Sequence, residues 1–363
     1  MSRFMQSVGQ PKWFAPGGVA PRVAKALVAL GLAGAAAFAA QAQVLPESGP
    51  LGKQSVSRLL LVDAERHGNR VVAVGDRGYI LVSDDNGESW RRAKSPAAPL
   101  LSAVTFVDAK HGWAVGHDAV ILASTDGGET WTKQFSAESE QRPLLDVMFL
   151  DPANGFAVGA YGAFYQTADG GKTWNGRQLL PPPPAPARGK ASAPAGRGAA
   201  SDEQTDEDRH LNAIVKLADG KLLVVGEAGK MARSDDGGKT WSRVEAPYKG
   251  SFFGAVQAQD GSVIVFGLRG RIYRADATLK GWKQVESASQ ATLMGGSLLP
   301  DGSIVLAGAA GTVLVSRDNG QSFSRFDSGT TRAFSKALLG GPNSVLALGE
   351  AGARDLIIPA ARR

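Results

Sequence analysis

The 363-residue sequence contains no cysteine. The chain therefore forms no disulfide, holds no thiolate-bound metal and has no cysteine nucleophile. The same absence excludes a lipoprotein anchor, which requires a cysteine directly after the export signal. Aromatic residues make up only 7% of the sequence, whereas Gly occurs 46 times and Pro 19 times. This balance favours many tight turns over long helices.

Common catalytic signatures are also missing. The sequence has no Gly-x-Ser-x-Gly elbow and no phosphate-binding loop. None of the five Tyr residues has an obvious carboxylate partner in the sequence, and the His residues show no metal-ligand spacing. We therefore expect no catalytic residue, no bound metal and no cofactor. The four His residues are His67, His111, His117 and His210.

The sequence lacks a strong net charge once its first 42 residues are set aside. The whole chain carries 40 basic and 34 acidic residues, a net charge of +6. Residues 1–42 contain four basic residues and no acidic one, so the remainder carries only +2. A nearly balanced charge gives little support for nucleic-acid binding, and we expect no nucleic-acid partner.

The N-terminal 42 residues resemble an export signal. A basic region precedes the apolar run Ala26–Ala40, and Ala40-Gln41-Ala42 fits the small-x-small cleavage pattern. No twin-arginine pair is present. We expect residues 1–42 to be a signal peptide and residues 43–363 to be a periplasmic protein, peripheral to the membrane and monomeric. An uncleaved membrane anchor is the alternative, although the run is shorter than the roughly 20 residues of a spanning helix.

One phrase recurs seven times: a short apolar run, a lead glycine, two variable residues and usually another Gly. The spacings between the lead glycines are 41, 43, 67, 41, 41 and 41 residues. A period near 40 with short β-type runs predicts an all-β fold, a seven-bladed β-propeller of four-stranded antiparallel blades. The lead glycines are Gly75, Gly116, Gly159, Gly226, Gly267, Gly308 and Gly349.

A second phrase, Ser/Thr-x-Asp-x-Gly-x-Thr/Ser followed by Trp or Phe, matches the Asp-box of BNR repeats. Its Asp carboxylate is suited to accept backbone N–H bonds within a hairpin turn. The aromatic residue can then fill the layer between blades. Calcium is a poor alternative, because each turn offers only one or two carboxylates. We expect structural roles for Asp85, Asp126, Asp169, Asp236 and Asp318.

Two segments depart from the repeat. The last unit ends before an outer strand, so we expect residues 43–57 to pair with the strand near Leu356–Ile358 and close the ring. An insertion at residues 180–209, between blades 3 and 4, contains a four-proline run, Ala, Gly and an acidic cluster. That composition predicts a disordered loop.

The variable positions after the lead glycines should gather on one face, because antiparallel blades place all strand 2–3 turns at the same end. A ring of unlike side chains suits binding of a protein or other ligand. The candidate binding residues are Arg77, His117, Tyr161, Arg269 and Arg271. Three further basic residues lie on or near the third strands, namely Lys230, Arg233 and Arg274.

The two phrases together resemble the photosystem II stability/assembly factor family. Trp113-Ala-Val-Gly116 with Asp126-Gly-Gly-Glu-Thr-Trp131 carries the resemblance, as does Phe156-Ala-Val-Gly159 with Asp169-Gly-Gly-Lys-Thr-Trp174. It covers nearly all of residues 55–358. The resemblance implies a non-catalytic exported scaffold that assists a membrane protein complex, such as photosystem II or a transporter. It implies a basic patch that Arg77, Arg269 and Arg271 match only loosely.

The alternative is a sialidase-like glycoside hydrolase or a glycan-binding propeller. A sialidase would need an arginine cluster, a Tyr nucleophile paired with an acid, and an acid/base carboxylate. The usual Arg-Ile-Pro phrase near the first blade is missing, and the corresponding stretch reads Ser57-Arg58-Leu59-Leu60. This absence favours the scaffold.

Overall fold

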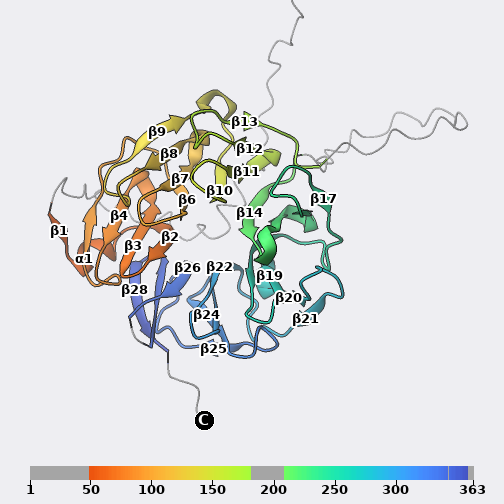
Figure 1. Ribbon diagram of the computed structural model, residues 1–363. Helices are drawn as coiled ribbons and strands as arrows, with labels where there is room; N and C mark the ends of the chain where they lie inside the picture. The colour runs from red at the N-terminus through yellow and green to blue at the C-terminus, as the bar shows by residue number, and fades with distance from the viewer. Residues whose placement is uncertain (1–48, 181–207, 342, 359–363) are drawn as a thin grey trace, which may run out of the picture. The chain divides into compact units, whose positions relative to one another are not determined.

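In a computed structural model, residues 49–180, 208–341 and 343–358 are described, and they form seven antiparallel sheets that follow one another along the chain (Figure 1). Each sheet is one blade, and the strand order runs from the innermost strand outwards. The expected seven-bladed β-propeller is thus confirmed. The expected signal peptide and nearly all of the expected insertion lie outside the described residues. Within the described ranges, no helix is long and apolar enough to span a membrane.

The first four blades each contain four consecutive strands in this pattern. In blade 1 these are β2 (Leu61–His67), β3 (Arg70–Gly75), β4 (Ile80–Ser83) and β5 (Trp90–Arg92); in blade 2, β6 (Leu101–Phe106), β7 (Gly112–Gly116), β8 (Ile121–Ser124) and β9 (Thr132–Phe135); in blade 3, β10 (Leu144–Phe149), β11 (Gly155–Gly159), β12 (Phe164–Thr167) and β13 (Asn175–Gly176); in blade 4, β14 (Leu211–Lys216), β15 (Leu222–Gly226), β16 (Met231–Ser234) and β17 (Ser242–Arg243).

Blades 5 and 6 repeat the pattern, and blade 7 has three strands in the described residues. Blade 5 contains β18 (Phe252–Gln257), β19 (Val263–Gly267), β20 (Ile272–Ala275) and β21 (Lys283–Val285); blade 6, β22 (Leu293–Leu298), β23 (Ile304–Gly308), β24 (Thr312–Ser316) and β25 (Ser324–Phe326); blade 7, β26 (Phe334–Leu339), β27 (Ser344–Gly349) and β28 (Gly352–Ile357).

Helical structure in the described residues is limited to single turns. One short α-helix precedes blade 1, and the other turns are 3₁₀. They are α1 (Lys53–Val56), η1 (Asp76–Gly78), η2 (His117–Ala119), η3 (Glu138–Glu140), η4 (Ala160–Gly162), η5 (Ala218–Gly220), η6 (Glu227–Gly229) and η7 (Leu268–Gly270).

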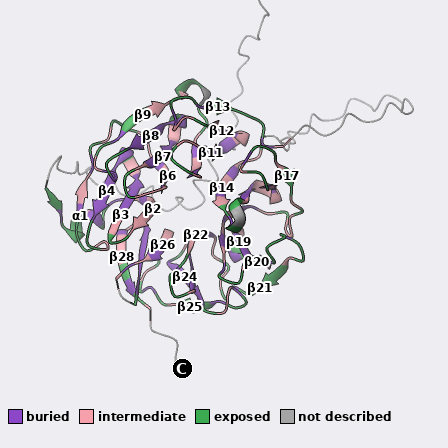
Figure 2. Cartoon of the chain, viewed as in Figure 1, coloured by how far each residue is buried: buried purple, intermediate pink, exposed green. Residues whose placement is uncertain are grey.

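The hydrophobic core consists of layers between neighbouring blades. Second strands such as β7 and β11 are buried along their whole length, because a blade has neighbours on both faces (Figure 2). Five of the seven layers also receive the aromatic residue of an Asp-box, which packs against the preceding blade. Trp131 of blade 2, for example, clusters with Val72 and Val74 of blade 1. Trp90 of blade 1 clusters with Leu346 and Leu348 of blade 7, so the same packing closes the ring.

The expected pairing between residues 43–57 and blade 7 is wrong for the described residues 49–57, and residues 43–48 lie outside the described part of the chain. Residues Pro50–Leu51 form β1, which pairs with β5 and so adds a fifth strand to blade 1. The segment reaches blade 7 without strand pairing: Val56 and Leu59 share a buried cluster with Leu346, and the Gly352 N–H donates to the Leu59 carbonyl at 2.9 Å. The ring closes instead through side-chain packing and through polar contacts between the innermost strands β26 and β2.

Candidate functional site

The strand 2–3 turns share one construction, and the end of the propeller that they form is called the loop face here. The residue after each lead glycine donates its N–H to the carbonyl just before the innermost strand of the same blade. His117 and Leu100 make this bond at 2.9 Å. A Cβ on Gly116 would overlap that Leu100 oxygen, so the close approach requires glycine. All seven lead glycines meet a carbonyl in this way.

The next residue of these turns adopts a left-handed conformation in six blades. Arg77 has a φ of 54°, Tyr161 of 53° and Arg269 of 58°. Non-glycine residues rarely adopt this conformation. A glycine follows in five of the six turns, and in blade 2 the following residue is Ala119, which is itself left-handed with a φ of 50°. The backbone is therefore uniform while the side chains differ from blade to blade. The complete set is Arg77, Asp118, Tyr161, Ala228, Arg269 and Ala310.

The five candidate binding residues all lie on this face, in blades 1, 2, 3 and 5. Arg77 is exposed and pairs with its neighbour Asp76 at 3.3 Å, and Arg269 and Arg271 are exposed. His117 is half-buried. Tyr161 is also half-buried. Among the described residues, no hydrogen bond or ion pair joins these five side chains to one another, so they form an open rim rather than a compact site.

One exposed residue of the rim, Arg332, was not predicted from the sequence. Arg332 is exposed in the connection that leads into β26, at the same end of the blade as Glu350 of the neighbouring turn. The sequence feature that could have indicated Arg332 is its position two residues before an innermost strand. Arg332 extends the basic arc of Arg269 and Arg271 in blade 5 towards Arg77 in blade 1.

Two of the additional basic residues on the third strands, Arg233 and Arg274, do not belong to this face. Arg233 donates to the Thr278 carbonyl at 3.1 Å, and Arg274 donates to the Asn319 carbonyl at 2.9 Å. Both acceptors lie in the strand 3–4 turn of the following blade, at the opposite end, called the box face here. Arg233 and Arg274 therefore link neighbouring blades and are not available to a partner on the loop face. Lys230 stands where Arg271 stands in blade 5, but it is buried.

The Asp-box turns make up the box face, and their carboxylates are closed within the turns. In blade 3, Asp169 accepts the Thr173 N–H at 2.9 Å and the Thr173 hydroxyl at 2.7 Å. Its other neighbour, Thr167, donates a hydroxyl at 2.9 Å. The backbone and hydroxyl bonds from Thr173 lower the pKa of Asp169 to about 2. The carboxylate is thus held as an anion by its own turn.

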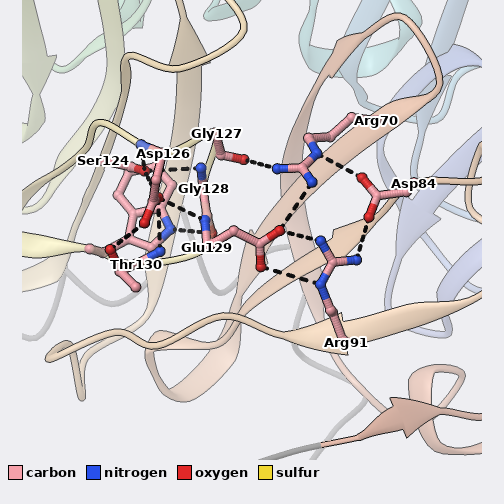
Figure 3. A network of polar contacts seen from close by, with 10 residues as sticks. Arg70, Asp84, Arg91, Ser124, Asp126, Gly127, Gly128, Glu129 and Thr130 are labelled. Carbon is pink, nitrogen blue, oxygen red and sulfur yellow. Dashed lines mark hydrogen bonds and ion pairs between the residues drawn. The ribbon is translucent and has the colours of Figure 1, made fainter.

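A network of arginines and carboxylates joins the box ends of blades 1 and 2 (Figure 3). Arg70 contacts Asp84 at 2.7 Å and Glu129 at 3.0 Å, and it donates to the Gly127 carbonyl at 2.9 Å. Arg91 contacts the same two acids, Asp84 at 2.6 Å and Glu129. Each guanidinium is therefore shared between two carboxylates, which suits a role in holding the blades together.

The innermost strands carry a second charged cluster. Lys336 of β26 contacts Asp63 of β2 at 3.0 Å, and Asp63 accepts the Val104 N–H of β6 at 3.0 Å. Burial acts against the charged form of Lys336, yet the nearby carboxylates of Asp63 and Glu65 raise its pKa above the usual value. Burial raises the pKa of Glu65 to about 7. These groups link blades 7, 1 and 2.

Asp146 of β10 has a similar role between blades 3 and 4. Its carboxylate accepts the Ile214 N–H of β14 at 2.8 Å and the Val147 N–H at 2.8 Å. Burial raises the pKa of Asp146 to about 7. Across the described part of the chain, no group of three or more His, Asp or Glu side chains is arranged to hold a metal ion.

Comparisons with known proteins agree with this architecture. Residues 134–297 match the family model described as "Photosynthesis system II assembly factor YCF48", and residues 122–133 match the "BNR/Asp-box repeat" model. The resemblance stated from the sequence is thus confirmed. No curated protein sequence matches the chain.

Among solved structures, "YCF48 bound to D1 peptide" has 18% identity and a TM-score of 0.62, over 88% of this chain and 99% of that one. "YCF48 from Cyanidioschyzon merolae" has 19% identity and a TM-score of 0.60, over 84% and 98%. A GH74 xyloglucanase from Xanthomonas campestris has 15% identity and a TM-score of 0.65, over 86% of this chain but 54% of the enzyme. At these identities the likeness shows the fold alone.

Proposed function

Starting from this resemblance to the photosystem II assembly factor family, we propose that the chain is a non-catalytic exported scaffold. It binds a membrane protein through the loop face and assists the assembly or work of the complex to which that protein belongs. The observation that carries the proposal is the construction of the loop face. In all seven blades the lead glycine packs against the carbonyl just before the innermost strand, and six of the turns share one backbone conformation while their side chains differ.

The chemistry of the rim suits a peptide or protein partner with acidic groups. Arg77, Arg269 and Arg271 are exposed, and a guanidinium can grip a carboxylate or two backbone carbonyls through its planar donors. Tyr161 and His210 supply aromatic surface on the same face, at blades 3 and 4, with ring centroids 5.1 Å apart. Arg and aromatic residues are the usual anchors of protein interfaces.

The similar structure named "YCF48 bound to D1 peptide" supports the proposal, because that protein is bound to a peptide. The box face has less to offer a partner. Its Asp carboxylates and several of its arginines are consumed by bonds within and between blades.

A capture experiment with charge-matched variants tests the proposal. The loop-face variant carries Arg77→Ala, Arg269→Ala and Arg271→Ala. The control carries Lys110→Ala, Lys172→Ala and Lys239→Ala, three exposed lysines of the box face with the same total charge change.

Captured membrane proteins from solubilised membranes would be compared with those of the unchanged chain. We expect the loop-face variant to lose affinity by at least about tenfold and the control to retain it, because a few Arg anchors dominate such interfaces. Equal capture by both variants would place the site elsewhere. Hydrolysis of a sialoside that depends on Tyr161 or Tyr273 would favour the glycosidase alternative.

A further inference from the structure

Blade 7 is one strand short within the described residues. Its outermost strand, β28, pairs only with β27, whereas each of the other six blades continues with a further strand. An unpaired outer strand presents backbone N–H and C=O groups along its free side. The free side of β28 is therefore a potential template for strand addition.

The exposure of β28 agrees with a missing neighbour. In blade 6 all five residues of the third strand, β24, are buried. In β28, Asp355 and Ile357 are exposed, and 74% of the Ile357 surface remains open. Ile357 is one of two large hydrophobic residues exposed in the described part of the chain.

The molecule itself shows that an outer blade edge can take another strand. β1 adds to β5 of blade 1 in antiparallel register, with Pro50 opposite Arg91 and Leu51 opposite Trp90. The N-terminal strand is thereby used on blade 1. Within the described residues no strand pairs with the outer side of β28, although residues of the N-terminal segment such as Val56 and Leu59 pack near its first residues.

A second copy of this chain fits the edge poorly. Residues directly opposite each other in antiparallel strands lie on the same face of the sheet. In a symmetric pair of β28 strands, one residue must therefore lie opposite the same residue of the other copy, with the two-fold axis between them. The middle residues of β28 are Arg354 and Asp355. Centring the axis on either one gives the longest overlap of the two strands but sets like charges opposite each other, which is destabilising. Centring it on Ala353 or Leu356 leaves only a short overlap.

The register of the missing strand follows from blade 5. Arg274 of β20 lies opposite Ile264, three residues before the lead glycine of blade 5. Asp355 lies opposite Leu346, three residues before the lead glycine of blade 7, so Asp355 is the equivalent of Arg274. In blade 5 the fourth strand places Lys283 opposite Arg274 and Gln284 opposite Tyr273. The equivalent residues of an added strand would face Asp355 and Arg354.

We propose that the edge of β28 is a docking site for an extended strand of another protein, added antiparallel, with a basic residue opposite Asp355 and an acidic residue opposite Arg354. Main-chain bonds to the edge supply affinity, and the adjacent opposite charges select the register and the partner. This site is distinct from the loop face and does not depend on it.

Two synthetic peptides of equal composition test the proposal. The first has the sequence of residues 281–287 with Gln284→Glu, which sets Lys opposite Asp355 and Glu opposite Arg354. The second carries Lys283→Glu and Gln284→Lys, which reverses both charges. Binding of each to the full chain is measured by calorimetry, and amide hydrogen exchange locates it.

We expect the first peptide to bind about tenfold more tightly than the second, since two cross-strand charge pairs change from attraction to repulsion. The double variant Arg354→Asp with Asp355→Arg should reverse that preference. The loop-face variant should keep it, which separates this site from the proposed function. Equal binding of the two peptides, or no binding of either at about 1 mM, would overturn the proposal. So would protection, in the free chain, of the β28 amides that face away from β27, or a dimer formed through β28.

Discussion

Replacing Trp131 with Ala removes a side chain that fills the layer between blades 1 and 2. Trp131 is 4% exposed, and its ring lies edge-on to Phe106 with centroids 6.0 Å apart. Its indole N–H donates to the Gly128 carbonyl of the same Asp-box turn at 2.9 Å. The substitution therefore leaves a cavity between two blades and an unpaired carbonyl in the turn.

Truncation of a buried Trp to Ala typically costs about 3–5 kcal/mol. An unfolding entropy of about 2.1 cal/mol/K per residue, over a propeller of roughly 300 residues, gives about 0.6 kcal/mol per degree. The expected fall in Tm is therefore about 5–8 °C. Thr132→Ala, at the exposed neighbouring position, should change the free energy of unfolding by less than about 0.5 kcal/mol.

Thermal and urea unfolding followed by circular dichroism measure both variants. A fall in Tm below about 2 °C for Trp131→Ala, with an unchanged urea slope, would refute the reasoning. It would mean that the Asp-box indole adds little to the layer between blades.

Three further outcomes follow from the structure. Gly116→Ala places a Cβ against a backbone carbonyl and should lower the free energy of unfolding, measured in urea, by about 1–3 kcal/mol. Gly52 has open space around it, so Gly52→Ala should leave this free energy unchanged. Lys336→Met leaves Asp63 without its cation and should lower the free energy of unfolding by about 3 kcal/mol. An unchanged urea midpoint would show that the ion pair contributes nothing. The folded pKa of Glu65, about 7, lies above its unfolded value of 4.5, so its contribution to stability is present below pH 4.5 and is lost as pH rises through 7. Glu65→Gln should therefore be more stable than the unchanged chain at pH 8 and similar at pH 5, and a pH profile of Tm that is identical in the two proteins would contradict this.

The blade count could be predicted from the sequence because its cause is local. Each lead glycine is required by a carbonyl of its own blade, and each Asp-box is closed by bonds to residues within four positions. The expected bonds of Asp126 to Thr130 need no knowledge of the rest of the fold. A repeated local requirement leaves a repeated signature.

The closure of the ring could not be predicted in the same way. Whether residues 50–51 add to blade 1 or to blade 7 depends on which of two edges lies nearer, and no local pattern records that choice. The pairing of Lys336 with Asp63 joins residues 273 positions apart and has no sequence signature.

The candidate site was predicted in part. Counting from the lead glycine placed Arg77 and Arg269 in the loop-face turns. The same counting places Arg274 seven residues after Gly267, on a third strand near the box face, so its separation from the rim could have been recognised. Arg332 lies outside the repeated phrase and was missed.

Site-specific photo-crosslinking in membranes tests the central claim most directly. A photoreactive residue replaces His117 or Arg269 on the loop face, and Lys172 or Lys239 on the box face. The account predicts crosslinks to a membrane protein from positions 117 and 269, and none from positions 172 and 239. Crosslinks to that protein from the box-face positions alone would contradict it.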